Sequence, residues 1–401
     1  MNILFVSISS MPHLSNHRIS HDLIREFRKN GHNMYVVCAA ERKENVDTYL
    51  SEEDGSKILR VKVGNNKKAN LIEKGLTTIF MPKMYIKAIK KYYSDVKFDL
   101  VMYPTPPVTQ YETVKFVKKR DGAKSYLLLK DIFPQNAVDI GMMKKSGVKG
   151  IIYKYFRAKE KKLYAISDRI GCMSRANVDY VLKHNPEINF EKIEICPNSI
   201  EFLDMTISVE QRVQVRKKYE IPLDKKVFIY GGNLGKPQGI PFILDCLNAV
   251  KNNTNAYFMI VGDGTEFKKI AAWFNEEKPE NMQLLKTLPK EDYDLLVAAS
   301  DVGLIFLDHR FTIPNFPSRL LAYLQAGVPV LACTDPNSDI GKVVTEGGFG
   351  WWCESDDVNS FSKCVASAVE SDSNEMKNRE IEYLKENYTV GTAYDTIIKH
   401  F

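Results

Sequence analysis

The sequence predicts an α/β protein made of two doubly wound, Rossmann-like domains. Segments of strand type and helix type alternate along the chain, as in parallel sheets with helices on both faces. After a charged stretch near residues 200–225, the same alternation restarts at Val227. The 401 residues are also too many for one ordinary core. We therefore expect two parallel sheets, one in each half of the chain.

The first half opens on a βαβ unit. A strand over 3–7 leads through a polar loop into a helix in which Ile19, Leu23 and Phe27 recur at helical spacing, before a stop at Gly31. The remaining elements expected here are strands over 34–38, 100–103, 126–129, 170–173 and 193–196, and a helix over 109–120.

The second half repeats this plan, and ligands of such sheets bind at the carboxyl ends of the strands. We expect a first domain of residues 1–200, a second of 201–385 and a helix over 386–401, with a central cleft between the domains. The strands expected in the second domain are 227–230, 257–261, 283–285, 303–307 and 329–332, and its helices include 242–250 and 320–326.

The composition, with 44% hydrophobic and 26% charged residues, is typical of a soluble globular protein. No stretch reaches the roughly 18 uninterrupted apolar residues of a membrane span. The chain runs from Met1 almost directly into a strand, which predicts no signal peptide. The seven cysteines are scattered and form no Cys-x-x-Cys pair, so we expect reduced thiols in a cytoplasmic protein, without disulfides or a zinc site.

The positive charge is concentrated in the first half. Residues 1–200 hold 35 Lys and Arg against 21 Asp and Glu, whereas residues 201–401 hold 21 against 29. Within 143–163, eight basic residues, Lys149 among them, alternate with aromatic ones. Two interpretations are open: a helix lying peripherally on the inner face of an anionic membrane, or a solvated helix packed by its aromatics. Nucleic acid is disfavoured, since no binding module is visible and the other half is acidic.

A glycine-rich loop follows the first strand of the second half. Residues 227–239 read Val-Phe-Ile-Tyr-Gly-Gly-Asn-Leu-Gly-Lys-Pro-Gln-Gly. A strand, a glycine loop and a helix start together present backbone N–H groups and a positive helix dipole to an anion. Beside Gly232, Lys236 adds a point charge, and Asn233 and Gln238 add neutral donors. The loop therefore predicts a phosphate site; the alternative is a tight turn without a ligand.

Several stretches occur in the order and spacing of a known family. They are Asp131-Ile-Phe-Pro-Gln-Asn, Pro197-Asn-Ser-Ile-Glu, Gly232-Asn-Leu-Gly-Lys-Pro-Gln-Gly, Val261-Gly-Asp-Gly, Phe316-Pro-Ser-Arg-Leu-Leu and Ala326-Gly-Val-Pro-Val-Leu-Ala. With these the chain resembles the retaining GT-B glycosyltransferases of bacterial capsule and O-antigen synthesis, family 4-like or group 1. The resemblance implies a GT-B fold, a nucleotide diphosphate-sugar donor in the second domain, an acceptor in the first, a last helix crossing back to the first, and no metal or other cofactor.

The sequence departs from the commonest pattern of this family. The usual diphosphate-binding Arg and Lys fall on Asn233 and Gln238, which leaves Lys236 as the basic residue of the loop. The usual pair of glutamates falls on Pro314 and Ala322. A histidine often found near the acceptor falls near Lys130.

Other residues are candidates for donor binding. Arg319, which follows Ser318 at a helix start, is the expected second phosphate ligand; otherwise it caps its own domain surface. The loop at Gly262 is expected to line the nucleotide, although the neighbouring Asp263 reads first as the cap of a helix beginning near residue 265. Asp339 is expected either to hold the donor sugar or to cap a helix.

The first domain supplies the remaining candidates. Asp131 follows a strand at its carboxyl end, where it is expected to act with Lys130 as a base or acceptor-orienting group, unless it is a satisfied turn aspartate. His17 and Arg18 lie at the first strand–helix junction and are expected to contact the acceptor; His17 alternatively lies free on the surface.

The predicted activity is transfer of a sugar from a nucleotide diphosphate-sugar to a lipid-linked saccharide of a bacterial surface polysaccharide, and the resemblance implies that the anomeric configuration is retained. Two rivals are open: a sugar-nucleotide epimerase of the same fold, and a catalytically silent binding subunit. A nicotinamide dehydrogenase is disfavoured because neither half opens with Gly-x-Gly-x-x-Gly and a trailing acid.

Overall fold

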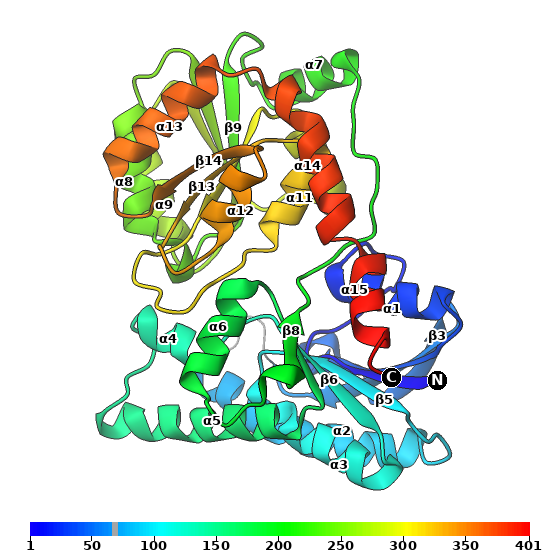
Figure 1. Ribbon diagram of the computed structural model, residues 1–401. Coiled ribbons are helices and arrows are strands. Elements are labelled where there is room, and N and C mark those ends of the chain that lie inside the picture. The colour runs from blue at the N-terminus through cyan, green and yellow to red at the C-terminus, as the bar shows by residue number, and fades with distance from the viewer. Residues whose placement is uncertain (66–70) are drawn as a thin grey trace. The chain divides into compact units, whose positions relative to one another are not determined.

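The computed structural model describes residues 1–65 and 71–401, and these divide into two compact units. Unit 1 comprises Met1–Glu201 and Thr389–Phe401, and unit 2 comprises Phe202–Tyr388. Each unit holds a single sheet covered by helices (Figure 1).

Unit 1 is built on a sheet in the order β3-β4-β2-β1-β5-β6-β7-β8. All neighbouring strands pair in parallel except β3 and β4, which form an antiparallel hairpin at the edge. The strand order therefore reverses direction between β1 and β5. The strands are β1 (Asn2–Val6), β2 (Asn33–Glu41), β3 (Tyr49–Glu53), β4 (Ser56–Val63), β5 (Leu100–Pro104), β6 (Lys124–Leu129), β7 (Arg169–Cys172) and β8 (Ile193–Ile195).

Helices cover both faces of this sheet. Helices α1 and α15 pack on each other over one face, and α2, α3 and α5 lie side by side over the other (Figure 1). The helices are α1 (Ile19–Lys29), α2 (Leu71–Tyr92), α3 (Tyr111–Asp121), α4 (Gln135–Asp139), α5 (Gly147–Ile166), α6 (Arg175–His184) and α15 (Val390–Ile398), with 3-10 turns η1 (Arg42–Glu44), η2 (Val108–Gln110) and η3 (Phe190–Lys192).

The last helix is part of the core of unit 1. In α15, Ala393 and Ile397 are buried in the same apolar cluster as Phe27 of α1. Tyr394 packs edge-on against Phe27, with ring centroids 4.9 Å apart, and its hydroxyl lies 3.0 Å from Nε2 of His32. The side chain of Thr389 accepts a hydrogen bond from the backbone N–H of Thr392, so α15 starts anew after α14 instead of continuing it.

Unit 2 repeats the doubly wound plan with a purely parallel sheet, in the order β11-β10-β9-β12-β13-β14. Numbered within the unit, this is the order 3-2-1-4-5-6 of dinucleotide-binding folds, which reverses between β9 and β12. The strands are β9 (Lys226–Asn233), β10 (Ala256–Asp263), β11 (Met282–Leu285), β12 (Val302–Phe306), β13 (Val330–Thr334) and β14 (Gly350–Glu354).

Helices on one side of unit 2 bury an apolar cluster against its strands. Ile243 and Leu247 of α8 and Phe361 of α13 meet Phe228 and Phe306 there. The helices are α7 (Val209–Lys218), α8 (Ile240–Val250), α9 (Phe267–Glu277), α10 (Lys290–Ala298), α11 (Arg319–Ala326), α12 (Ile340–Glu346), α13 (Val358–Glu370) and α14 (Ser373–Asn387), with the 3-10 turn η4 (Lys236–Gln238).

Candidate functional site

The glycine loop of unit 2 lies at the point where the strand order reverses. It leaves β9, forms η4 and enters α8 directly after Gly239. The backbone of Pro237 accepts a hydrogen bond from the N–H of Asp308, just beyond β12, at 2.9 Å. The loop is therefore fixed at the carboxyl edge between β9 and β12, where open α/β sheets bind their ligands.

Two of the predicted neutral donors stabilise the loop itself. The side-chain amide of Asn233 donates to Oε1 of Gln238 at 3.0 Å, and the backbone N–H of Gly235 donates to the same oxygen at 3.1 Å. The structure thus brings Asn233 and Gln238 together across the loop. Lys236 is exposed on this loop, and no hydrogen bond or ion pair joins its side chain to a residue in the described ranges.

Arg319, the other predicted phosphate ligand, lies against this loop. Its Nε donates to the carbonyl oxygen of Gly231, and its Nη2 lies 3.1 Å from the hydroxyl of Tyr230. A Cβ added at Gly232, where φ is 128°, would lie 2.6 Å from Nη2. Glycine at position 232 is therefore needed both for its backbone conformation and for the approach of the guanidinium.

Tyrosines hold the Arg319 guanidinium in place. It lies over the ring of Tyr230, 4.2 Å from the centroid. Burial acts to lower the pKa of Arg319, but the tyrosines around it outweigh this effect and raise the pKa, so the group stays charged. Its Nη1 has no partner within residues 1–65 and 71–401. Arg319 and Lys236 therefore leave positive charge at this loop that no described carboxylate neutralises.

Gly262 lies beside the glycine loop, as its predicted role requires. It pairs with Gly232 in the register of β9 and β10, and a Cβ at Gly262 would overlap the carbonyl oxygen of Gly232. Asp263 accepts a hydrogen bond from the backbone N–H of Gly264 at 2.8 Å. Helix α9 starts only at Phe267, with Glu266 in the N-cap position, so the interpretation of Asp263 as the helix cap is wrong.

Ser318 and Asp339 lie at the starts of two different helices. Ser318 is the exposed N-cap residue of α11, and its hydroxyl makes no capping bond. Asp339 is the N-cap residue of α12, again without a side-chain capping bond.

The sequence did not single out Asp335, a second carboxylate of this region. It follows β13 and is fully buried. Its Oδ1 accepts hydrogen bonds from the backbone N–H groups of Asn337, at 3.0 Å, and Ser338, at 3.1 Å. Burial raises its pKa to about 6. The Asp-Pro-Asn-Ser turn pattern was the available signal, but turn aspartates are too common for it to point to a site.

In unit 1, Lys130 and Asp131 follow β6 at the carboxyl edge of the sheet. Oδ2 of Asp131 accepts a hydrogen bond from the side chain of Asn136 at 2.7 Å, while Oδ1 is buried without a partner in the described part of the chain. Burial raises the pKa of Asp131 to about 6 and lowers that of Lys130 to about 8. Both groups thus change charge near neutral pH, which suits proton transfer and is unusual for a satisfied turn aspartate.

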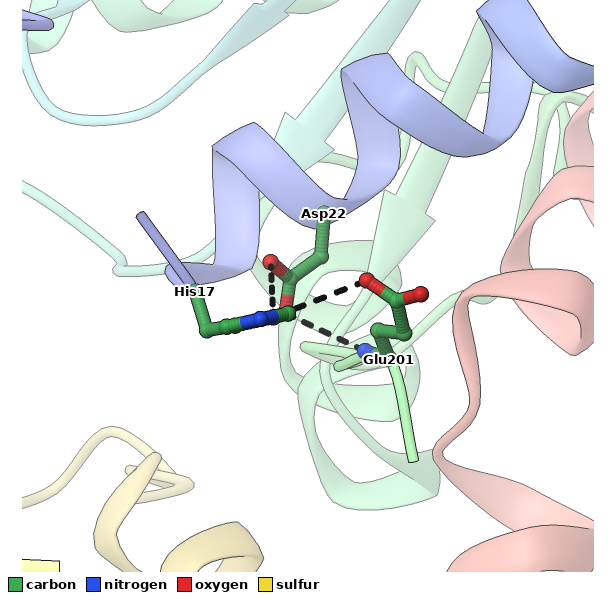
Figure 2. Close-up of side chains that lie close together, drawn as sticks. All are labelled: His17, Asp22 and Glu201. Atoms are coloured by element: carbon green, nitrogen blue, oxygen red, sulfur yellow. Dashed lines mark hydrogen bonds and ion pairs between the residues drawn. The ribbon is translucent and has the colours of Figure 1, made fainter. Parts of the chain in front are cut away.

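His17 belongs to a network of side chains around the start of α1. Its Nδ1 lies 3.7 Å from Oδ1 of Asp22 and 3.5 Å from Oε2 of Glu201, and the backbone N–H of Glu201 donates to Asp22 at 3.1 Å (Figure 2). His17 is therefore not a free surface residue. The adjacent Arg18 is exposed, and its side chain has no partner in the described ranges.

His17, Asp22 and Glu201 have the donor types of a metal site, with ligand atoms within 4.8 Å of one another. However, Nη2 of Arg25 lies 2.6 Å from Asp22, 2.8 Å from Glu201 and 3.0 Å from Nδ1 of His17. The guanidinium therefore already supplies the positive charge that a metal ion would bring to these groups. Arg25 was missed from the sequence because its partner Glu201 lies 176 residues away.

Comparison with known proteins assigns these units to a class of enzyme. A family model described as Glycosyl transferases group 1 matches residues 211–387, which include the glycine loop and Arg319. The chain is a glycosyltransferase. It is 26% identical over 335 residues to the probable glycosyltransferase WbjE of Pseudomonas aeruginosa, covering 82% of this chain and 80% of that protein. It is 20% identical over 362 residues to the putative colanic acid biosynthesis glycosyl transferase WcaI of Escherichia coli K12, covering 86% of each.

Solved structures show the fold of the glycosyltransferase. HepE of Anabaena, in complex with UDP, matches with a TM-score of 0.68 at 14% identity, covering 100% of this chain and 99% of that one. Sucrose-phosphate synthase from Thermosynechococcus elongatus matches with a TM-score of 0.76 at 11% identity, covering 100% and 98%. The predicted GT-B fold with two Rossmann-like domains is thereby confirmed, while the cleft between the domains and the roles of the site residues stay predictions.

Proposed function

We propose that this glycosyltransferase takes its sugar from a nucleotide diphosphate-sugar held by the glycine loop of unit 2. The observation that carries the proposal is the charged guanidinium of Arg319 docked on that loop, which also carries Lys236, whose side chain has no ion-pair partner among the described residues. Structures of HepE with UDP and with UDP-glucose support a donor of this class.

Departure of the nucleotide diphosphate is the step these cations would assist. As the bond to the sugar breaks, negative charge grows on the leaving phosphate, and fixed cations and backbone N–H groups stabilise it. Arg319 can still offer its Nη1, and Lys236 a mobile ammonium. Gly232, Gly262, Asn233 and Gln238 shape the loop that positions the phosphates. In this proposal the transfer needs no bound metal or other cofactor.

The acceptor is assigned to unit 1. Asp131, with a raised pKa and one unpartnered oxygen, is proposed to orient or deprotonate the acceptor hydroxyl, with Lys130 beside it. His17 and Arg18 are proposed to contact the acceptor sugar. Ser318 and Asp339 complete the proposed donor contacts. Retention of anomeric configuration is part of the proposal.

The acceptor is proposed to be a lipid-linked saccharide of a bacterial surface polysaccharide, such as a capsule, an exopolysaccharide or an O-antigen. The name of WcaI, which refers to colanic acid biosynthesis, supports this class of product. A lipid-linked acceptor would place the enzyme in the cytoplasm, peripherally at the inner face of the cell membrane.

A donor screen tests the proposal. The purified enzyme is incubated with UDP-, GDP- and dTDP-sugars, with and without an extract of lipid-linked saccharides, and released nucleotide and product are measured. We expect one donor to be consumed with transfer to the acceptor. Conversion of the donor without any acceptor would identify a sugar-nucleotide epimerase. Failure to bind or consume any donor would leave a silent binding subunit and refute the proposal.

A further inference from the structure

Helix α2 carries a row of uncovered apolar side chains. Leu76, Ile79, Phe80 and Met84 are each between 39 and 51% exposed. They recur at intervals of one, three and four residues, so they lie along the same side of the helix. An exposed apolar row of this kind on a soluble domain usually marks a contact surface.

Helix α5 carries a second apolar group. Ile151, Ile152 and Tyr155 fall within two turns and are between 39 and 68% exposed. Its neighbour Phe156 instead packs on Phe133, with ring centroids 5.1 Å apart. Phe156 of α5 therefore packs inward, whereas Tyr155 is exposed. Packing within the unit does not explain the exposed apolar side chains of this helix.

Both groups belong to one layer of helices. Oγ1 of Thr109 in η2 donates to the backbone oxygen of Thr78 in α2 at 2.9 Å, and α5 also contacts η2. On α3, which contacts both α2 and α5, Glu112 pairs with Lys159 of α5. We call the outer surface of α2, α3 and α5 the basic–apolar face.

The charges on these three helices are almost all positive. Helix α2 contains five basic residues and one acidic residue, α3 contains four and two, and α5 contains six and one. All four carboxylates are already paired with a basic residue: Glu73 with Arg42, Glu112 with Lys159, Asp121 with Arg120 and Glu160 with Arg157. Among the charged residues of these helices, Lys149 alone has a side chain that lies outside the described part of the chain.

Some of the remaining positive charge lies next to the apolar groups in the sequence. On α2, Lys83 lies between Phe80 and Met84 and Lys87 follows them, and on α5 Lys154 directly precedes Tyr155. No carboxylate of a described residue pairs with any of these three lysines. The exposed lysines of these three helices without such a partner are Lys83, Lys87, Lys90, Lys91, Lys115, Lys119, Lys154 and Lys162.

We propose that the basic–apolar face docks on an anionic phospholipid bilayer. Exposed apolar side chains together with lysines that have no carboxylate partner in the described residues are the combination that such a surface binds, because the apolar side chains enter the interface while the ammonium groups meet lipid phosphates. In the described part of the chain, no helix is long and apolar enough to cross a membrane, so the contact is peripheral. This inference rests on unit 1 alone and is independent of the donor site.

Vesicle binding tests the proposal. The full-length protein is floated with phosphatidylcholine vesicles with or without about one third phosphatidylglycerol, at low and at physiological salt. We expect binding only to the anionic vesicles. The double variants Ile79→Ser with Phe80→Ser, and Ile151→Ser with Ile152→Ser, should each lower the partition coefficient by about tenfold or more, because apolar burial in the interface is lost. Lys83→Glu with Lys87→Glu should lower it similarly.

Phe190 provides a matched control, because it is an exposed apolar residue of unit 1 that lies on η3, outside this face. Phe190→Ser should leave vesicle binding unchanged. Circular dichroism checks that every variant is folded. Absence of binding to anionic vesicles at low salt would overturn the proposal. Equal binding by the serine variants, or a lysine-dependent affinity for single-stranded RNA without vesicle binding, would also overturn it.

Discussion

At the scale of single residues, Arg319 and Asp131 carry most of the account. The sequence placed Arg319 after Pro-Ser at a helix start, but it could not reveal Tyr230, which lies 89 residues earlier and contacts the guanidinium only after β9 and α11 are packed. Likewise, Asp131 was recognisable at a strand end, but its raised pKa depends on burial that only the folded chain shows. Long-range contacts of this kind limit what residue patterns can predict.

The hydroxyl of Tyr230 provides the first residue-scale prediction. It lies 3.1 Å from Nη2 of Arg319 and donates to the backbone oxygen of Asn233 at 2.7 Å. Tyr230→Phe keeps the ring under the guanidinium but removes both bonds, and should weaken binding of UDP by about 0.5–1.5 kcal/mol in a calorimetric titration. Tyr257→Phe, on the neighbouring strand, is the control. Equal affinities for both variants would show that the hydroxyl does not position Arg319.

The carboxyl group of Asp131 should set a pH dependence. If the ionised form orients or deprotonates the acceptor, kcat/KM should rise as the pH rises through about 6, where burial places the pKa of Asp131. Asp131→Asn should abolish most of the activity together with this ionisation. Binding of UDP should remain unchanged in the variant. An active variant with the wild-type pH profile would remove Asp131 from the proposed chemistry.

At the scale of elements, strands with clear apolar runs were predictable and irregular ones were not. The strand at β9 and the loop after it stood out because glycines follow four apolar residues. By contrast, β3 and β4 form an edge hairpin rich in charged residues, and α2 contains Pro82 and has apolar residues on its exposed as well as its buried side, so none of the three was expected. The secondary structure of such segments is determined by edge pairing and tertiary packing, not by their local sequence.

Helix α14 contains a buried acid that should lower stability. Glu380 is fully buried, and neither carboxylate oxygen has a partner in the described part of the chain. Burial, opposed by Lys377 and Arg379, raises its pKa from 4.5 to about 8. The folded state therefore holds the proton more tightly than the unfolded state, so the free energy of unfolding should fall as the pH rises from about 4.5 to 8.

Replacing Glu380 tests the predicted direction of this pH dependence. Glu380→Leu should raise the free energy of unfolding at pH 7.5 by about 1–3 kcal/mol, because a buried polar group without a partner is removed. Denaturant titrations across the pH range should show a smaller loss of stability with rising pH than in the wild type. A variant that is less stable than the wild type at pH 7.5 would show that Glu380 has a partner.

Helix α15 should be needed for the stability of unit 1. Ile397 is fully buried in the cluster it shares with α1, whereas Ile398 is only partly buried. Ile397→Ala should cost about 2–4 kcal/mol and speed hydrogen exchange in α1 and β2. Ile398→Ala is the control and should cost less. Faster exchange in β9 and β10, with none in α1, would contradict the placement of α15 in unit 1.

At the scale of the whole molecule, the two halves of the chain differ in net charge and in the substrate that each is proposed to bind. The basic first half contains the proposed acceptor residues and the basic–apolar face, and the second half, although acidic overall, contains Lys236 and Arg319 of the proposed donor site. The alternating pattern predicted two Rossmann-like domains because strand and helix periodicities are local properties. Donor, acceptor and linkage depend on side-chain geometry around a ligand, which local patterns do not determine.

The central claim is that unit 2 binds a nucleotide diphosphate through Arg319 and Lys236. Calorimetric titration with UDP, GDP and dTDP tests it most directly, using the wild type, Arg319→Ala, Lys236→Ala and the control Lys342→Ala, which alters another exposed lysine of the unit. We expect one nucleotide to bind, and each of the first two variants to lose about 1.5–3 kcal/mol of binding free energy while the control loses none. Absence of heat from all three nucleotides, or equal affinities in all four proteins, would contradict the claim.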